Sequence, residues 1–122
     1  MKETAKDIDD YTIKKIQELK QEDDKLYQAV VHLVFLRKNN PKLRATLGRL
    51  IYEYLGGKEW HHILPILSFI ELSTISTYVL DDIIDDQLER EGNEATWRKF
   101  GLNYGIIAGS LQAFLSIRML SD

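Results

Sequence analysis

The apolar stretch at residues 63–80 constrains the fold of this chain more than any other feature of its sequence. Isoleucine, leucine, valine and phenylalanine residues lie on nearly all sides of a helix there, and no alternating strand pattern interrupts them. A helix that is apolar on all sides is usually buried in a protein core. Ser68, Glu71 and Ser73 make the stretch too polar for a membrane span. We therefore expect a central buried helix at about residues 60–88.

The other segments of the chain also have helical patterns. Only two prolines and seven glycines occur among the 122 residues. Apolar residues recur at helical spacing over residues 5–19, 24–37, 41–55 and 102–120, and a short segment covers residues 95–100. The sequence thus predicts an all-α fold, an antiparallel helical bundle that forms a single domain over residues 1–122.

The sequence allows more specific predictions for two of these helices. The helix at residues 41–55 has an apolar stripe that we expect to face the core, formed by Leu43, Leu47, Leu50, Ile51 and Tyr54. In and before the last helix, Gly101, Gly105 and Gly109 recur at every fourth position. This spacing predicts close contact with a neighbouring helix.

Composition narrows the possible classes of function. The chain has no cysteine, so it has neither disulfides nor a thiolate metal site. Its formal net charge of −3 gives no general attraction to nucleic acid. The charged N-terminus lacks the apolar core of a signal peptide. We expect a cytoplasmic protein that binds no nucleic acid.

Four aspartates, Asp81, Asp82, Asp85 and Asp86, follow directly after the apolar stretch. On a helix, Asp81 and Asp85 lie on one face about 5–6 Å apart, and Asp82 and Asp86 form a second such pair. Like charges at this spacing destabilise a helix by about 0.2–0.5 kcal/mol per pair. The pattern therefore predicts a cation between the carboxylates; the alternative is a solvated helix end.

Carboxylates without His or Cys companions suit hard cations, chiefly Mg²⁺. Mg²⁺ keeps several waters and is typically held by one or two carboxylates together with substrate phosphates. The candidate metal ligands are Asp81, Asp82, Asp85 and Asp86. Arg90 can reach the same phosphates with its forked guanidinium. This donor set favours a diphosphate that completes the coordination of Mg²⁺.

Small polar residues share the helix face of the first acid pair. Thr74, Thr77 and Tyr78 precede Asp81 and Asp85 at helical steps of three and four. We interpret Thr74, Thr77 and Tyr78 as residues that line a cleft. The alternative is that the hydroxyl residues of this helix only allow close helix packing.

Three motifs together resemble a known family. Asp81-Asp82-Ile83-Ile84-Asp85, followed by Arg90-Glu91-Gly92, resembles the first aspartate-rich region of the type I (trans) isoprenyl diphosphate synthases. Pro41-Lys42-Leu43-Arg44 is similar to the family's Gly-Gly-Lys-x-x-Arg segment, and Ala108-Gly109-Ser110-Leu111 to its Ala-Gly-Asp-x-Leu helix. Order and spacing agree over about residues 40–120, which makes the three motifs in register a specific signal.

The resemblance implies a fold, a chemistry and roles for residues. The fold would be the N-terminal half of the isoprenoid synthase fold. In the family, magnesium ions hold an allylic diphosphate, which ionises, and the double bond of isopentenyl diphosphate attacks the carbocation. Carried over, Asp81 and Asp85 would be catalytic metal ligands with Asp82 in support. Arg90, Arg44 and Lys42 would contact diphosphate.

The departures from the family pattern concern mainly the isopentenyl diphosphate pocket. The Lys of the Gly-Gly-Lys segment is Pro41 here, the usual His or Gln of the central helix is Thr74, and the second Arg of Arg-Arg-Gly is Glu91. The Asp of Ala-Gly-Asp is Ser110, and the family's second aspartate-rich motif is not within these residues.

Half of such a cavity would leave an apolar wall in contact with water. We therefore expect a homo-oligomer, a dimer or higher, in which two aspartate-rich motifs face each other. This oligomer would either catalyse prenyl transfer or only bind a prenyl diphosphate. A non-catalytic or regulatory small subunit of a heteromeric synthase is the second interpretation. A helical interaction module without a ligand is the third.

Histidines give weaker signals. Glu59 and His62 have the spacing of half a carboxylate-bridged di-iron site, which a second copy would have to complete. His32 lies on an apolar helix, and we expect it to be packed in the core.

Overall fold

The computed structural model describes residues 1–21 and 23–121, and most of these residues are helical. The elements are α1 (Lys2–Ile16), the 3-10 helix η1 (Gln17–Gln21), α2 (Asp24–Leu36), α3 (Leu43–Tyr54), the 3-10 helix η2 (Trp60–Ile63), α4 (Leu64–Ile84), β1 (Glu89–Arg90), β2 (Asn93–Glu94), α5 (Thr96–Phe100) and α6 (Leu102–Met119). The all-α prediction is confirmed. The short hairpin of β1 and β2 was not predicted, because each strand has only two residues.

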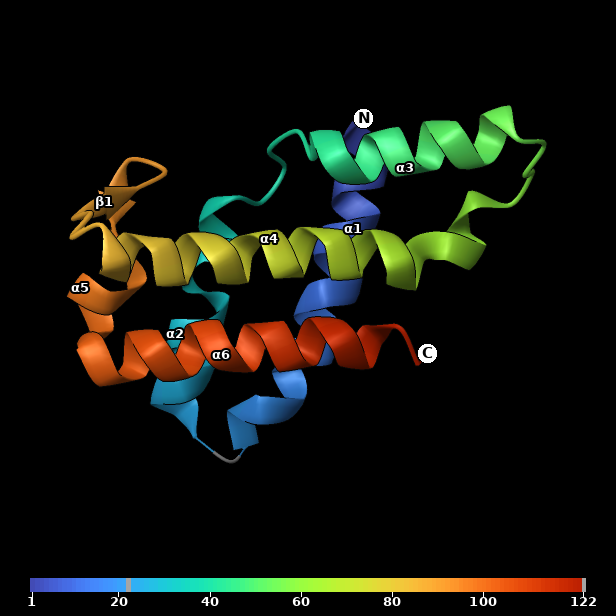
Figure 1. Cartoon of the computed structure of the whole chain (residues 1–122). Helices are drawn as coiled ribbons and strands as arrows, with labels where there is room; N and C mark the ends of the chain where they lie inside the picture. Colours follow the sequence, from blue (N-terminus) through green and yellow to red (C-terminus); the bar gives the residue numbers. More distant parts are fainter. Residues whose placement is uncertain (22, 122) are drawn as a thin grey trace.

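The helices form two layers (Figure 1). Helices α3, α4 and α6 lie side by side with α4 in the middle, and α4 runs antiparallel to both neighbours. Helices α1 and α2 cross behind this layer and pack on α4 and α6. The central position predicted for the apolar stretch is confirmed, since α4 contacts α1, α2, α3 and α6. Residues Trp60–Ile84 have the length and mean hydropathy of a membrane-crossing helix, a property that buried core helices share.

The central helix is shorter than predicted at both ends. Residues Trp60–Ile63 form a 3-10 turn, and α4 ends at Ile84 rather than near residue 88. Asp85 is the C-cap, and Asp86 has a positive φ of 52°. The N–H of Gln87 donates to the carbonyl of Asp82 at 2.8 Å, and the N–H of Asp86 to that of Ile83 at 3.4 Å. These bonds form a Schellman motif, which stops the helix within the acid cluster.

Close packing of α6 on α4 and α5 depends on glycines, as predicted from their spacing. A Cβ atom at Gly109 would lie 2.7 Å from Leu80, and one at Gly105 would lie 2.7 Å from the Cβ of Trp97. The hydroxyl of Ser76 donates to the carbonyl of Gly109 at 2.7 Å. Gly101 instead has a positive φ of 95° and joins α5 to α6. Buried side chains of α2, α4 and α6 form the main core.

The orientation of α3 differs from the prediction. Its large apolar side chains are exposed, namely Leu43, Leu47, Leu50, Ile51 and Tyr54. The inward residues are the small Ala45 and Gly48, and a Cβ at Gly48 would lie 3.0 Å from Leu67 of α4. The apolar stripe of α3 is real, but the described part of the chain does not cover it.

Helices α4 and α6 also carry exposed apolar side chains on the sides opposite their buried residues, so together with the stripe of α3 we infer one exposed apolar face, on the side of the layer opposite α1 and α2. We define this face by Leu47, Ile51, Leu55, Ile66, Ile84, Ile106 and Ile117, each of which is at least 44% exposed. Leaving apolar surface in water is unfavourable by roughly 25 cal/mol per Å². Exposed apolar patches of this kind mark sites where a protein, a membrane or a ligand binds.

Candidate functional site

Asp81 and Asp85 present exposed carboxylates at the end of α4. The N–H of Asp85 donates to the carbonyl of Asp81 at 2.8 Å, so the two residues are one helical turn apart. Within residues 1–21 and 23–121, neither carboxylate forms an ion pair. This pair is available to a cation.

Asp82 differs from its neighbours because it is 2% exposed and already paired. Its carboxylate accepts two hydrogen bonds from Arg90, at 2.6 Å from Nη2 and 3.2 Å from Nε. The hydrogen bond to Asp82 raises the pKa of Arg90. The guanidinium also lies 4.6 Å from the ring centroid of Tyr78. Asp82 therefore supports the site by positioning Arg90.

Asp86 lies outside the helix, so the second predicted acid pair does not form. Its positive φ of 52° turns it away from the helical path, while Asp82 faces the protein interior. The Schellman motif at residues 82–87 is the physical reason, because it ends α4 at Ile84, two residues before Asp86. Of the four predicted metal ligands, Asp81 and Asp85 are thus the two that share an exposed helical face.

The β1–β2 hairpin holds Arg90 beside Asp82. Arg90 pairs with Asn93 across the hairpin, and Glu91 and Gly92 form its turn with positive φ. Glu91 accepts hydrogen bonds from Arg37 Nη1 at 2.9 Å and from Asn40 Nδ2 at 3.1 Å. Glu91, at the position of the family's second Arg, thus ties the hairpin to the segment between α2 and α3.

Arg37 and Glu71 were missed by sequence reasoning. Arg37 Nε donates to the buried carboxylate of Glu71 at 3.0 Å, and its guanidinium lies 5.4 Å from the ring of Tyr78. Burial lowers the pKa of Arg37, but the carboxylates of Glu71 and Glu91 outweigh this and raise it. The position of Glu71 within the apolar stretch could have predicted a cationic partner, since a buried Glu without a partner is rare.

The predicted cleft residues lie on the helix as expected but are not enclosed. Thr77 is exposed and donates to the carbonyl of Ser73 at 3.1 Å, and Thr74 donates to that of Ile70 at 2.8 Å. Tyr78 is half-buried, and the guanidiniums of Arg37 and Arg90 lie 5.4 Å and 4.6 Å from its ring centroid. These residues form an open wall in this chain.

The predicted diphosphate ligands Lys42 and Arg44 differ in exposure. Arg44 is exposed in the first turn of α3. Lys42 is buried, and its Nζ lies 3.0 Å from Asp9 Oδ1 and also donates to the carbonyls of Arg37 and Asn40. In this structure the charge of Lys42 is paired inside the protein, so Arg44 is the exposed one of the two predicted diphosphate ligands. Asp9 lies on α1, too far along the chain for sequence spacing to show the contact.

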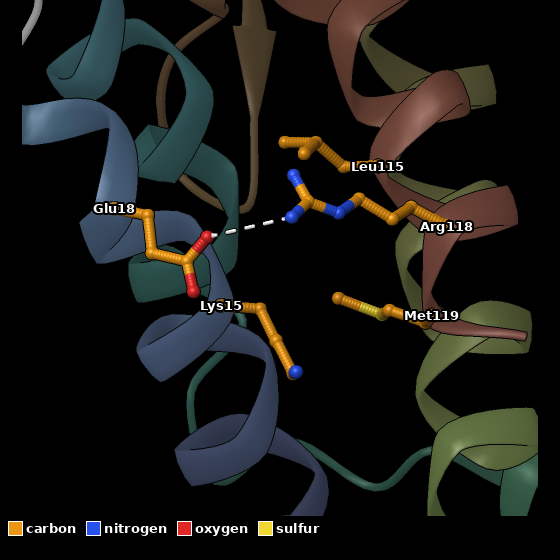
Figure 2. A pocket seen from close by; sticks show the side chains of 5 residues that line it. All are labelled: Lys15, Glu18, Leu115, Arg118 and Met119. Atoms are coloured by element: carbon orange, nitrogen blue, oxygen red, sulfur yellow. Dashed lines mark ion pairs between the residues drawn. The ribbon is translucent and has the colours of Figure 1, made fainter. Parts of the chain in front are cut away.

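Two hollows occur away from the acid cluster. A cavity of about 50 Å³ lies between α1, η1 and α6, where Arg118 Nη2 is 4.0 Å from Glu18 Oε2 (Figure 2). A groove of about 410 Å³ runs along α2 and α5. His32 lines this groove and is only half-buried, with Nε2 2.9 Å from the carbonyl of Glu94. Its predicted place in the core is therefore corrected, and burial is the main cause that lowers its pKa.

Comparison with known proteins decides the family. The model of the polyprenyl synthetase family matches residues 23–122. The chain belongs to the polyprenyl synthetase family. A short chain isoprenyl diphosphate synthase of Methanocaldococcus jannaschii is 32% identical over 103 residues, which cover 82% of this chain and 31% of that protein.

A solved structure supports the same assignment. The geranylgeranyl pyrophosphate synthetase of the archaeon Geoglobus acetivorans aligns with a TM-score of 0.76 and 30% identity. The alignment covers 95% of this chain and 38% of that one. The resemblance inferred from the three motifs is confirmed, and the fold is that of part of an isoprenoid synthase. The chain spans about a third of the length of these relatives.

Proposed function

We propose that the acid end of α4 binds a prenyl diphosphate through Mg²⁺. The observation that carries the proposal is the exposed pair Asp81 and Asp85, which stands beside the Asp82–Arg90 ion pair at one end of the exposed apolar face. Oxygen-only ligands in this number fit Mg²⁺, which takes its remaining ligands from phosphates and water.

Each part of the site contributes differently to binding. Asp81 and Asp85 would hold the metal, which neutralises the diphosphate and stabilises it as a leaving group. Arg90, oriented by Asp82 and Tyr78, would donate to the phosphate oxygens. The exposed apolar face, which reaches Ile84 next to Asp85, would receive the hydrocarbon chain, at about 0.8 kcal/mol per buried CH₂.

This proposal is tested by thermal unfolding with Mg²⁺ and diphosphates. We expect an increase in Tm when MgCl₂ and a prenyl diphosphate are both present, and a smaller one with MgCl₂ and inorganic diphosphate, which lacks the apolar chain. A ligand at 100 times its Kd stabilises the folded state by about 2.7 kcal/mol. An unchanged Tm under all of these conditions would contradict the proposal.

The exposed apolar face also supports a second copy of this chain as its partner. A two-fold axis parallel to α4 would bury the face of each copy against the other. It would also bring both acid clusters to the same end of one shared apolar interior, because the direction of α4 is retained by such a rotation. We further propose that this homo-oligomer catalyses prenyl transfer.

Self-association can be tested by light scattering. We expect a mass of at least twice the 14.2 kDa of one chain. The Ile51→Asp and Ile117→Asp variants should be monomeric, because they place a charge within the apolar face without touching the core. Phe35→Asp on α2 is the matched control, since Phe35 is also exposed but lies outside this face. A monomeric wild-type chain would rule out the homo-oligomer.

A non-catalytic subunit of a heteromeric synthase is the second candidate. It is favoured by Glu91, whose carboxylate is bound to Arg37 and Asn40 at a position where the family pattern has Arg. An assay with radiolabelled isopentenyl diphosphate and an allylic primer distinguishes the transferase from the non-catalytic subunit. Product from the purified chain supports the transferase, whereas binding without product supports the subunit.

A further inference from the structure

Three potential metal ligands from two distant segments converge near the N-terminus of α1. Glu3 and Asp7 are one helical turn apart on α1, and His61 belongs to η2. One ligand atom from each residue lies within 4.8 Å of the other two. His61 Nε2 is already 2.8 Å from Asp7 Oδ2. These residues are separate from the acid cluster at the end of α4.

The imidazole of His61 is held in place by neighbouring side chains. Its ring lies 3.9 Å from that of Trp60, which is buried. The guanidinium of Arg49 lies 4.1 Å from the ring centroid of Trp60, and its Nη1 donates to Thr4 Oγ1 at 2.8 Å. These packing contacts therefore fix the position of the His61 imidazole relative to α1.

We propose that Glu3, Asp7 and His61 bind a divalent first-row transition metal such as Zn²⁺. Two carboxylates and a neutral imidazole match the charge of such an ion. The imidazole can carry its proton on Nδ1, which leaves Nε2 as a lone-pair donor. A nitrogen ligand favours Zn²⁺ over Mg²⁺, whereas the oxygen-only pair on α4 favours Mg²⁺.

The geometry requires only a small adjustment. Bonds from Zn²⁺ to nitrogen and oxygen are about 2.0–2.2 Å, which places tetrahedral ligand atoms about 3.3 Å apart. The side chain of Glu3 is 65% exposed and free to make this movement. Arg49 Nη1 lies 3.5 Å from Glu3 Oε2 and is the competing cation, but Arg49 would retain Thr4 and Glu53 as partners.

Bound metal would connect α1 to the segment before α4, because Asp7 and His61 are 54 residues apart in the chain. A ligand that binds only the folded state stabilises it. Zn²⁺ binding should therefore be visible both as heat in a calorimetric titration and as an increase in Tm of the full chain.

The test titrates ZnCl₂ into the wild type, His61→Ala, Asp7→Asn and the matched control His62→Ala. His62 is also exposed and adjacent in sequence but is outside the cluster. We expect one site in the wild type and in the control. His61→Ala and Asp7→Asn should each weaken Zn²⁺ binding by about tenfold or more, which corresponds to a loss of at least about 1.4 kcal/mol.

This inference would be overturned by no Zn²⁺ binding in the wild type, by equal affinity in His61→Ala, by an equal loss in His62→Ala, or by the loss of binding when Asp81 and Asp85 are both replaced with asparagine. Circular dichroism of each variant establishes that it is folded. The titration is repeated in an Asp81→Asn, Asp85→Asn background. Zn²⁺ binding that survives there belongs to α1 and η2, and Zn²⁺ binding lost there would show that the ion occupies the α4 acids instead.

Discussion

Replacing Asp81 and Asp85 together with asparagine is expected to abolish the increase in Tm that Mg²⁺ and a prenyl diphosphate produce. These two carboxylates are exposed, one helical turn apart and without an ion-pair partner among the described residues. Their loss would leave the diphosphate without its metal. The unliganded variant should be at least as stable as the wild type, because two like charges at i and i+4 are removed.

The matched control is the double variant Glu89→Gln, Glu94→Gln. It removes the same charge from two exposed residues that face each other across the nearby hairpin. We expect this variant to keep the ligand-dependent increase in Tm. Asp86→Asn should also keep most of it, since Asp86 lies beyond the end of the helix. If the Asp81, Asp85 variant retains the full increase, the metal is bound elsewhere.

Replacing Lys42 with methionine is expected to cause the largest loss of stability in the chain. The Lys42 and Asp9 side chains are 1% and 4% exposed, with Nζ 3.0 Å from Oδ1. Removing one partner of a buried ion pair costs about 3–5 kcal/mol, because the other charge remains buried without compensation. This is a large part of the 5–15 kcal/mol that typically separates folded from unfolded states. Urea unfolding measures the effect.

A second substitution distinguishes a buried charge from a packing defect. Adding Asp9→Asn to Lys42→Met removes the unpaired charge and leaves an oxygen that can accept the N–H of Asn39, now at 3.0 Å from Asp9 Oδ2. We expect the double variant to be more stable than Lys42→Met alone. Lys6→Met is the control, since Lys6 pairs with Asp10 on the surface and should change stability little. Equal losses in Lys6→Met and Lys42→Met would refute this account.

The exposed apolar face is expected to be covered when the protein acts, and the side chains of α3 give the reason. Ala45 and Gly48 allow α3 to approach α4, while Leu47 and Ile51 remain outside. This arrangement would be unfavourable for an isolated chain in water. Self-association and prenyl diphosphate binding are therefore connected, because the same surface would contact both the second copy and the hydrocarbon chain.

Local features of the sequence determined the helices, the central position of α4 and the placement of Asp81 and Asp85 at its end. Helical periodicity and the turn-to-turn spacing of the acids depend only on neighbouring residues, so these could be predicted. The three motifs in register likewise indicated the family. Periodicity predicted the apolar stripe of α3 as well, but it could not indicate whether the stripe faces this chain or a partner.

Only the tertiary structure decided which charged residues are available to a ligand. Asp82 and Asp86 look equivalent in sequence, yet one is paired with Arg90 and the other lies past a Schellman turn. Lys42 is adjacent to a family motif but is buried against Asp9 of α1. Whether a charge is available depends on partners that are distant in sequence. A buried charge without an oppositely charged partner is costly, so the residues that the fold brings next to it decide whether it is paired.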